Sequence, residues 1–303
     1  DLEAPVEGTK FMMDTIVTVK LLKGGNEDIL KTMFEKLDDI DKRMSLNDVN
    51  SDVNQININA GKQSVLISNE TKYVIKKALD YSELSNGYFD VSFGPLIHLW
   101  DIGSDNPKVP SDTDIQSALQ LIDYNNINVQ GNFVGLDQEL MSIDLGGIAK
   151  GYAADLMSDI AKDAGVTSGI INLGGNILVI GTKNEEPFKI GIQNPFALRN
   201  GYLGIIKAED QTVVTSGNYE RYFEIDGKRY HHILDKDTGY PADNGIAAVS
   251  IVTSYSIDAD ALSTLLYIVG IDRGLALVET LENTECLYIT TNQDIVLSSG
   301  MKD

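Results

Sequence analysis

The chain of 303 residues contains one cysteine, Cys286, so no disulfide can form within it. Cys286 lies in an apolar stretch over residues 285–290, where we expect a buried structural thiol. No run of the sequence approaches the roughly 20 consecutive apolar residues that a membrane-spanning helix needs. We therefore expect neither an internal disulfide nor insertion of the folded chain into a membrane.

Basic residues are also scarce. Lysine and arginine number 24 against 45 aspartates and glutamates, which gives a formal net charge of −21. Proteins that bind nucleic acid displace counterions from the phosphate backbone with clustered Lys and Arg. We therefore expect no nucleic-acid binding, and any phosphate group must be met locally by backbone amides, a few basic side chains or a metal ion.

Hydrophobic patterning indicates an α+β fold with mixed β-sheets flanked by helices. Apolar residues at helical spacing predict helices over residues 27–40, 69–85, 111–121, 148–164, 256–269 and 271–281. Alternating and β-branched residues predict strands over 11–22, 126–130, 133–136, 140–144, 247–253, 287–290 and 295–297, with a strand-rich region over 169–225. Because strands and helices do not alternate strictly and no Pro-rich linker divides the chain, we expect one domain over 11–303 after an extended segment, 1–10.

Two glycine pairs follow predicted strands. In Asp144-Leu-Gly-Gly-Ile-Ala-Lys150 the glycines precede a predicted helix, whose N-terminus could bind phosphate. The segment is neither a Walker loop nor a Gly-x-Gly-x-x-Gly fingerprint, so a tight turn with Asp144 as helix cap is an equally good interpretation. In Asn172-Leu-Gly-Gly175 the asparagine could read a base or ribose edge, although a hairpin turn is the simpler interpretation.

Two further segments carry candidate catalytic groups. His231 and His232 are adjacent on a predicted strand, so only one of them can face a given site as a general base. A lone histidine is more often structural, although the turn-rich segment that follows favours a shaped loop. Asp260 and Thr264 are four residues apart and share one face of a predicted helix. A carboxylate beside a hydroxyl suits Mg²⁺, although Asp258 or Asp260 could instead cap the helix while Thr264 bonds to helix carbonyls.

Two weaker features complete the set. Residues 214–221 form a strand-turn-strand that contains Thr215, Ser216 and Arg221. Residues 87–95, with Trp100, form an apolar and aromatic wall, for which core packing is the stronger interpretation.

Taken together and in this order, these segments resemble the FAD:protein FMN transferases, the ApbE-like flavin transferase family. The resemblance covers nearly the whole chain from about residue 11 onward. Each motif is weak alone, but the ordered set is specific. The residues that carry it are Met13-Asp-Thr15, Gly87-Tyr-Phe-Asp90, Gly94-Pro95, Trp100, the 144–151 and 172–175 segments, Thr215-Ser-Gly217, His232-Ile233, Thr238-Gly-Tyr-Pro241, and Asp260 with Thr264.

The resemblance implies a cleft that binds FAD together with Mg²⁺. It gives catalytic roles to His232, as the base, and to Asp260, whereas His231 has no counterpart and is expected to be structural. The implied metal ligands are Asp260, Thr264 and the backbone carbonyl of Gly147. The implied FAD-binding residues are Met13, Asn47, Trp100, Asp144, Lys150, Asn172, Gly174, Gly175, Thr215, Ser216 and Ile233.

The resemblance also implies transfer of FMN from FAD to a Thr or Ser hydroxyl of an exported flavoprotein, with release of AMP. We expect the protein outside the cytoplasm, where an N-terminal lipid anchor would hold it. Two positions depart from the family pattern: Asn47 stands where an aromatic residue is frequent, and Asn176 where Asp is common. The alternatives are an FAD hydrolase that uses water and an exported FAD carrier without chemistry; His232, Asp260 and Thr264 together favour an enzyme over a carrier.

Overall fold

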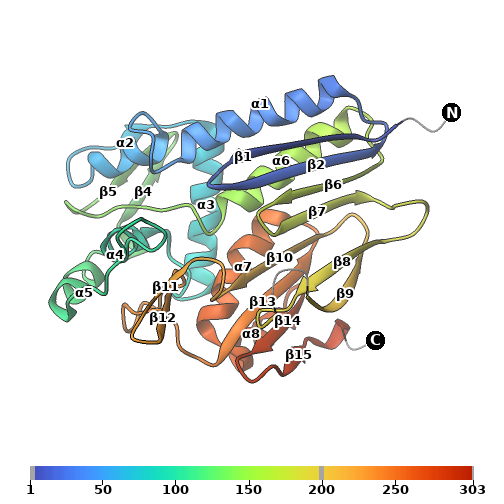
Figure 1. Ribbon diagram of the computed structural model, residues 1–303. Coiled ribbons are helices and arrows are strands. Elements are labelled where there is room, and N and C mark those ends of the chain that lie inside the picture. The colour runs from blue at the N-terminus through green and yellow to red at the C-terminus, as the bar shows by residue number, and fades with distance from the viewer. Residues whose placement is uncertain (1–3, 198–200, 302–303) are drawn as a thin grey trace.

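Eight strands form one antiparallel sheet, which lies in the right-hand part of the view in Figure 1. The computed structural model describes residues 4–197 and 201–301. Every strand pairing in the described residues is antiparallel, and helices lie between the strands in sequence, so the α+β prediction is confirmed. The strands follow in spatial order: β1 (Val6–Met12), β2 (Thr15–Lys23), β6 (Ser168–Leu173), β7 (Asn176–Gly181), β10 (Thr212–Gly217), β13 (Ile246–Thr253), β14 (Glu285–Thr290) and β15 (Ile295–Leu297).

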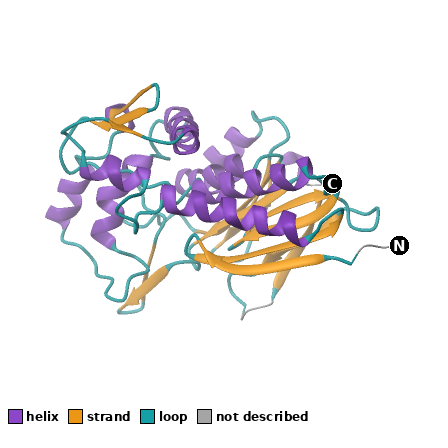
Figure 2. Cartoon of the chain, turned by 90° about the horizontal axis from the view of Figure 1, so that it is seen from above, coloured by secondary structure: helices purple, strands orange, loops and turns teal. Residues whose placement is uncertain are grey.

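Helices cover one side of this sheet (Figure 2). Their apolar stripes meet the sheet in the main core, and β13 is buried along its whole length. The hairpin of β8 (Phe188–Gln193) and β9 (Tyr202–Ala208) packs against the sheet through a second apolar cluster. The covering helices are α1 (Glu27–Met44), α6 (Ala149–Asp163), α7 (Ser256–Val269) and α8 (Ile271–Val278), and α3 (Asn69–Leu84) packs beside α1.

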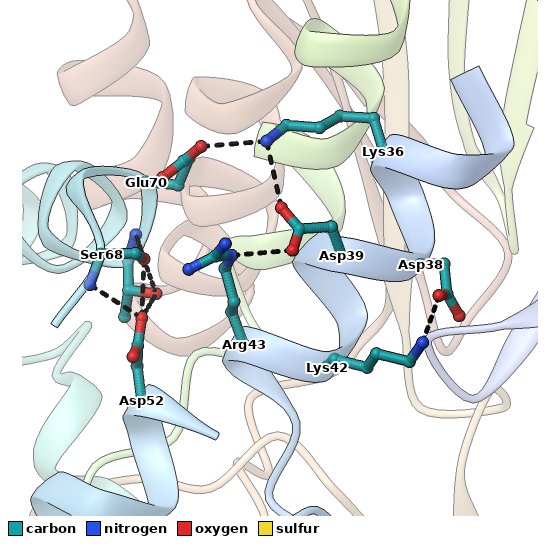
Figure 3. Close-up of polar contacts among 9 residues, drawn as sticks. Lys36, Asp38, Asp39, Lys42, Arg43, Asp52, Ser68 and Glu70 are labelled. Carbon is teal, nitrogen blue, oxygen red and sulfur yellow. Dashed lines mark hydrogen bonds and ion pairs between the residues drawn. The ribbon is translucent and has the colours of Figure 1, made fainter. Parts of the chain in front are cut away.

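A polar network joins the first helices at the edge of the core (Figure 3). Lys36 Nζ on α1 donates to Asp39 at 3.1 Å and to Glu70 on α3 at 3.0 Å. Asp52 begins the short helix α2 (Asp52–Ile58) and accepts from the Ser68 N–H and hydroxyl, at 3.0 and 2.6 Å. These bonds fix α1, α2 and α3 relative to one another without adding apolar contact.

A smaller lobe has its own apolar cluster, separate from the main core. It combines α4 (Gly94–Trp100) and α5 (Asp112–Leu119) with the isolated hairpin β11 (Tyr222–Ile225) and β12 (Lys228–His231), which lie beside one another in Figure 1. A further three-stranded sheet consists of β3 (Val65–Leu66), β5 (Phe133–Leu136) and β4 (Ile127–Gln130). Single 3₁₀ turns occupy Val91–Phe93, Tyr124–Asn126 and Ser299–Met301.

Most predicted elements are confirmed, and two strands are wrong. The predicted strand 11–22 is a hairpin, because Met13 and Asp14 adopt φ of 51° and 57° and turn the chain back between β1 and β2. Residues 6–10 of the predicted lead-in therefore lie in β1, whereas residues 1–3 are outside the described residues. The predicted strand 140–144 has no strand partner, because the Asn57 side chain bonds both Ile143 N, at 2.7 Å, and Ile143 O, at 3.0 Å.

The helices α2 and α4 had no sequence signal strong enough to predict them. Both have seven residues, too few for a helical stripe to stand out. Among the described helices, none is both long and apolar enough to cross a bilayer.

Candidate active site

A cavity opens where the turn before α6, the helix α7 and the segment after β12 meet. Sequence segments that are far apart converge there, since its walls come from the main sheet, the helical layer and the small lobe. The predicted site residues that border it are Trp100, Asp144, Gly147, Lys150, Gly174, Thr215, Ser216, His232, Ile233, Asp260 and Thr264.

Asp260 lies on α7 and is buried, yet its carboxylate faces the start of α6. Its Oδ2 accepts from the Gly151 backbone N–H at 2.8 Å, and the N-cap residue of α6, Ile148, provides no side-chain cap. Asp260 thus satisfies one free N–H of α6 and lies at the positive end of its dipole. Burial nevertheless raises the pKa of Asp260, while the charges of Lys150 and Arg221 and the Gly151 N–H oppose that rise.

Three oxygen ligands here suit a magnesium ion: the Asp260 carboxylate, the Thr264 hydroxyl and the Gly147 carbonyl. Asp260 Oδ1 and Thr264 Oγ1 have no hydrogen-bond partner among the described residues, so Thr264 does not bond back to its helix as the alternative interpretation required. A Cβ added to Gly147 would lie 3.7 Å from Thr264 Oγ1, which places the Gly147 backbone beside that hydroxyl. The described residues hold no group of three or more His, Cys, Asp or Glu side chains placed to bind one metal ion. Such a sparse oxygen set fits Mg²⁺, which keeps waters and takes substrate oxygens.

His232 and His231 face different surroundings, as their adjacency predicts. His232 borders the cavity, whereas the buried His231 makes a 3.0 Å bond from Nε2 to Ala242 O. The His232 N–H donates to Arg221 O at 3.1 Å, and its Nδ1 lies 3.3 Å from the same carbonyl. Because a carbonyl can only accept, this contact places the ring proton on Nδ1 and leaves Nε2 free to take a proton.

The protonation state of His232 also suits a base. Burial lowers the pKa of His232 to about 3, and the nearby charges of Arg221 and Lys150 lower it as well. The imidazole is therefore neutral at pH 7 before any anionic substrate enters the cavity. A bound anion would raise the proton affinity of Nε2 and so assist proton transfer to it.

The turn before α6 borders the cavity and brings Lys150 to it. Asp144 Oδ1 accepts from Gly146 N at 2.5 Å, so Asp144 closes a local turn and does not cap α6. Lys150 Nζ donates to Gly146 O at 3.2 Å and makes no ion pair among the described residues. A cation without a carboxylate partner beside a helix N-terminus is an arrangement that binds phosphate.

Four predicted residues do not border the cavity. Met13 lies in the β1–β2 turn and donates its N–H to Asp41 at 3.0 Å, and Asn47 is exposed after α1. The other two are Asn172 and Gly175, which close the turn between β6 and β7: Asn172 Oδ1 accepts from Gly175 N at 3.0 Å. Gly174, which lies between Asn172 and Gly175 and has φ of 60°, does border the cavity. It packs closely against Thr15 of the β1–β2 hairpin.

Thr215 and Ser216 border the cavity, but neighbouring side chains already bond their hydroxyls. Thr215 Oγ1 lies 2.7 Å from Ser250 Oγ, and Ser216 Oγ lies 2.8 Å from Ser263 Oγ. These bonds connect β10 to β13 and to α7. The two hydroxyls therefore hold the cavity wall in place whatever they contact in a substrate.

Sequence reasoning assigned no role to Glu220 or Arg221, which follow this strand and also border the cavity. Neither side chain forms a hydrogen bond or ion pair among the described residues. Desolvation beside the cavity raises the pKa of Glu220 to about 7, although Lys150 and Arg221 lower it. The signal that could have found them is a charged pair one residue after the polar Thr-Ser-Gly-Asn turn.

The wall over 87–100 and Asn176 were also left without assigned contacts. Tyr88, Phe89 and Asp90 border the cavity, so part of this wall faces the site while the remainder packs in the core. Asn176 is buried, accepts from Ser256 Oγ at 2.5 Å, and borders the cavity. Its Nδ2 has no hydrogen-bond partner in the described part of the chain.

Comparisons with known proteins match almost the whole chain. The model of the ApbE family matches residues 13–288. A FAD:protein FMN transferase of Klebsiella pneumoniae is 36% identical over 293 residues, 96% of this chain and 91% of that protein. One of Treponema pallidum is 32% identical over 90% of this chain and 80% of that protein. The crystal structure of the ApbE protein from Thermotoga maritima, 34% identical, has a TM-score of 0.91 and covers 98% of both chains. The flavin transferase ApbE from Vibrio cholerae, 26% identical, has a TM-score of 0.88 over 98% of both chains.

Proposed function

Because the chain belongs to the ApbE family, we propose that it transfers the FMN half of FAD to a hydroxyl group of another protein and releases AMP. One observation carries the proposal: a neutral histidine, a phosphate-binding turn and three oxygen donors for a cation border the same cavity. A carrier of FAD needs a binding surface but has no use for a base placed beside a cation site.

The residues of the α6 turn would hold the pyrophosphate of FAD. Lys150 supplies a positive charge, and the turn at Gly146 and Gly147 lets the backbone approach the phosphate oxygens. Asp260, Thr264 and the Gly147 carbonyl would hold Mg²⁺, which when bound neutralises phosphate charge and stabilises the charge that develops in transfer. These assignments explain why a protein of net charge −21 can bind an anionic dinucleotide.

The transfer is a displacement at phosphorus. The oxygen of the acceptor hydroxyl attacks the phosphorus on the FMN side, and an oxygen–phosphorus bond forms. The bond from that phosphorus to the bridging oxygen breaks, and AMP leaves with the electron pair. His232 Nε2 takes the hydroxyl proton, because Nδ1 is held by Arg221 O and the ring is neutral beforehand.

The acceptor and the location are part of the same proposal. We infer that the acceptor group is a Thr or Ser hydroxyl of an exported flavoprotein, since an alcohol becomes a useful nucleophile only beside a base such as His232. We place the reaction outside the cytoplasm, at a cell surface or in a periplasm, where a lipid anchor would hold the enzyme. Support for this location comes from the acidic composition and the single cysteine.

The test is the intact mass of a candidate acceptor after incubation with the protein, FAD and Mg²⁺. A mass gain of one FMN group that disappears when Mg²⁺ is chelated supports the proposal. FAD cleavage to FMN and AMP without any mass gain across a panel of exported flavoprotein subunits supports hydrolysis by water. Tight FAD binding without cleavage supports the carrier.

A further inference from the structure

The segment that carries His232 is not part of the main sheet. His232 follows β12 directly, and β11 and β12 pair only with each other among the described strands. Arg221 precedes β11, so Arg221 and His232 lie across from each other at the base of this hairpin, joined by the bond from His232 N to Arg221 O. Something other than the sheet must therefore fix the position of the proposed base.

Trp100 makes the contacts that can do so. It is the single tryptophan of the chain, it ends α4, and none of its surface is exposed. Its ring lies 5.6 Å from Tyr230 and 6.4 Å from Phe223 between centroids, and these two residues lie on β12 and β11. The hairpin thus rests on Trp100 through aromatic packing.

Trp100 also holds the chain that follows His232. Its indole Nε1 donates to Gly239 O at 2.8 Å, and its ring lies 5.4 Å from Tyr240. Gly239 has φ of 72°, and a Cβ there would lie 2.3 Å from Ile115 Cγ2, so the turn sits tightly against α5. One buried side chain therefore contacts the chain on both sides of His232, before it at Tyr230 and after it at Gly239.

We propose that Trp100 is a positioning residue, which holds Nε2 of His232 beside the attacking acceptor hydroxyl by fixing the β11–β12 hairpin and the turn at Gly239. This inference rests on the proposed function and changes the role of Trp100 from the FAD contact that the family resemblance implied. Trp100 borders the cavity, but its side chain is fully buried and its N–H is already bonded to a carbonyl. Its contacts instead lead to the histidine.

The kinetic test is Trp100→Phe, which keeps a ring but removes the N–H donor and part of the packing. The expected result is a fall in kcat for FMN transfer of about 10- to 100-fold, because small displacements of a catalytic group cost about that much, with the KM for FAD within about 3-fold of wild type. Tyr240→Phe is the matched control: it keeps the ring beside Trp100 and removes only the exposed bond from the Tyr240 hydroxyl to Asp112 on α5, so kcat should stay within about 2-fold. A raised KM with unchanged kcat, or no change at all, would overturn the proposal.

A second readout does not depend on activity. The chain has three histidines, so the ring resonances of His232 can be assigned with one His232→Gln sample and titrated by NMR. The titration midpoint of His232 should lie well below the ordinary value in the wild type and rise by at least about one pH unit in Trp100→Phe, as the hairpin loosens. Tyr230→Leu, on the hairpin side of the same contact, should shift it likewise if Trp100→Phe does not fold.

The rate of FMN transfer and the titration midpoint of His232 test the proposed function and the role of Trp100 separately. If the wild type transfers no FMN but the His232 midpoint moves in both variants, the proposed function fails while the positioning role stands. If the wild type is active and the midpoint stays where it is in both variants, Trp100 does not position His232.

Discussion

The α6 backbone at Gly151 packs directly against the α7 backbone, and enlarging that residue should disable the site. A Cβ on Gly151 would lie 2.2 Å from Ser256 O and 2.6 Å from Ile257 Cα, both backbone atoms of α7 that cannot turn aside. Ordinary contact needs at least 3.4 Å. Gly151→Ala must therefore separate the two helices by roughly 1 Å.

The same residue donates the 2.8 Å hydrogen bond to Asp260, so the separation also weakens that bond. Overpacking costs about 1–3 kcal/mol, and loss of a bond to a buried carboxylate costs about 1.5–3 kcal/mol. The better helix propensity of alanine offsets about 1 kcal/mol. The net loss should be about 1.5–5 kcal/mol in the free energy of unfolding. FMN transfer should fall about 100-fold, because Asp260 moves away from Gly147 and Lys150.

Urea unfolding and the rate of FMN transfer measure the two effects separately. Gly204→Ala is the control, since a Cβ there meets nothing within 4 Å and both quantities should remain near wild type. Wild-type stability together with wild-type transfer in Gly151→Ala would refute the reasoning, because the helix crossing would then not position Asp260.

Three other predictions concern the metal site, the core and a buried histidine. Asp260→Asn keeps an oxygen for the Gly151 N–H but loses the charge. The rate of FMN transfer should fall at least about 100-fold and no longer depend on the Mg²⁺ concentration. A variant whose rate depends on Mg²⁺ as the wild type does would remove Asp260 from the metal site. Asn57→Ala leaves both backbone groups of the buried Ile143 unbonded and should lower the free energy of unfolding in urea by about 2–3 kcal/mol. Asn57→Asp, which keeps an acceptor for the Ile143 N–H, should give an intermediate loss. A loss near zero would contradict the role given to Asn57. Burial lowers the pKa of His231 to about 4, so between pH 6.5 and 4 the unfolded state binds more protons and stability falls as the pH falls. From pH 7 to 5 the free energy of unfolding of the wild type should fall by about 2 kcal/mol more than that of His231→Gln. Equal losses would show that His231 is not buried as a neutral group.

Much of the fold could be predicted because its signals are local. Asn26 accepts from Ile29 N at the start of α1, as its place before two acidic residues predicts, and the apolar stripe of that helix is the stripe that packs in the core. The spacing of Asp260 and Thr264 similarly placed both on one face of α7, and the structure brings that face to the cavity. Caps and periodicities of this kind need no distant partner.

The failures arose where a distant residue decides the local structure. The 140–144 segment has the composition of a strand, but Asn57, more than 80 positions earlier, takes the backbone bonds that a strand partner would make. The N-terminus of α6 is satisfied by Asp260 from another helix, so no capping residue near Asp144 could reveal its surroundings. Glu220 carries no motif of its own, and only the folded chain brings it to the cavity with Lys150 and Arg221.

The balance of products tests the central claim most directly. In one reaction with FAD, Mg²⁺ and an acceptor flavoprotein, the AMP released is quantified together with the FMN gained by the acceptor, for the wild type and for His232→Gln. A transferase whose base is His232 gives one AMP for each FMN attached, and the variant slows both products equally. AMP released in excess without FMN on the acceptor, at a rate that His232→Gln leaves unchanged, would contradict both the transfer and the role of His232.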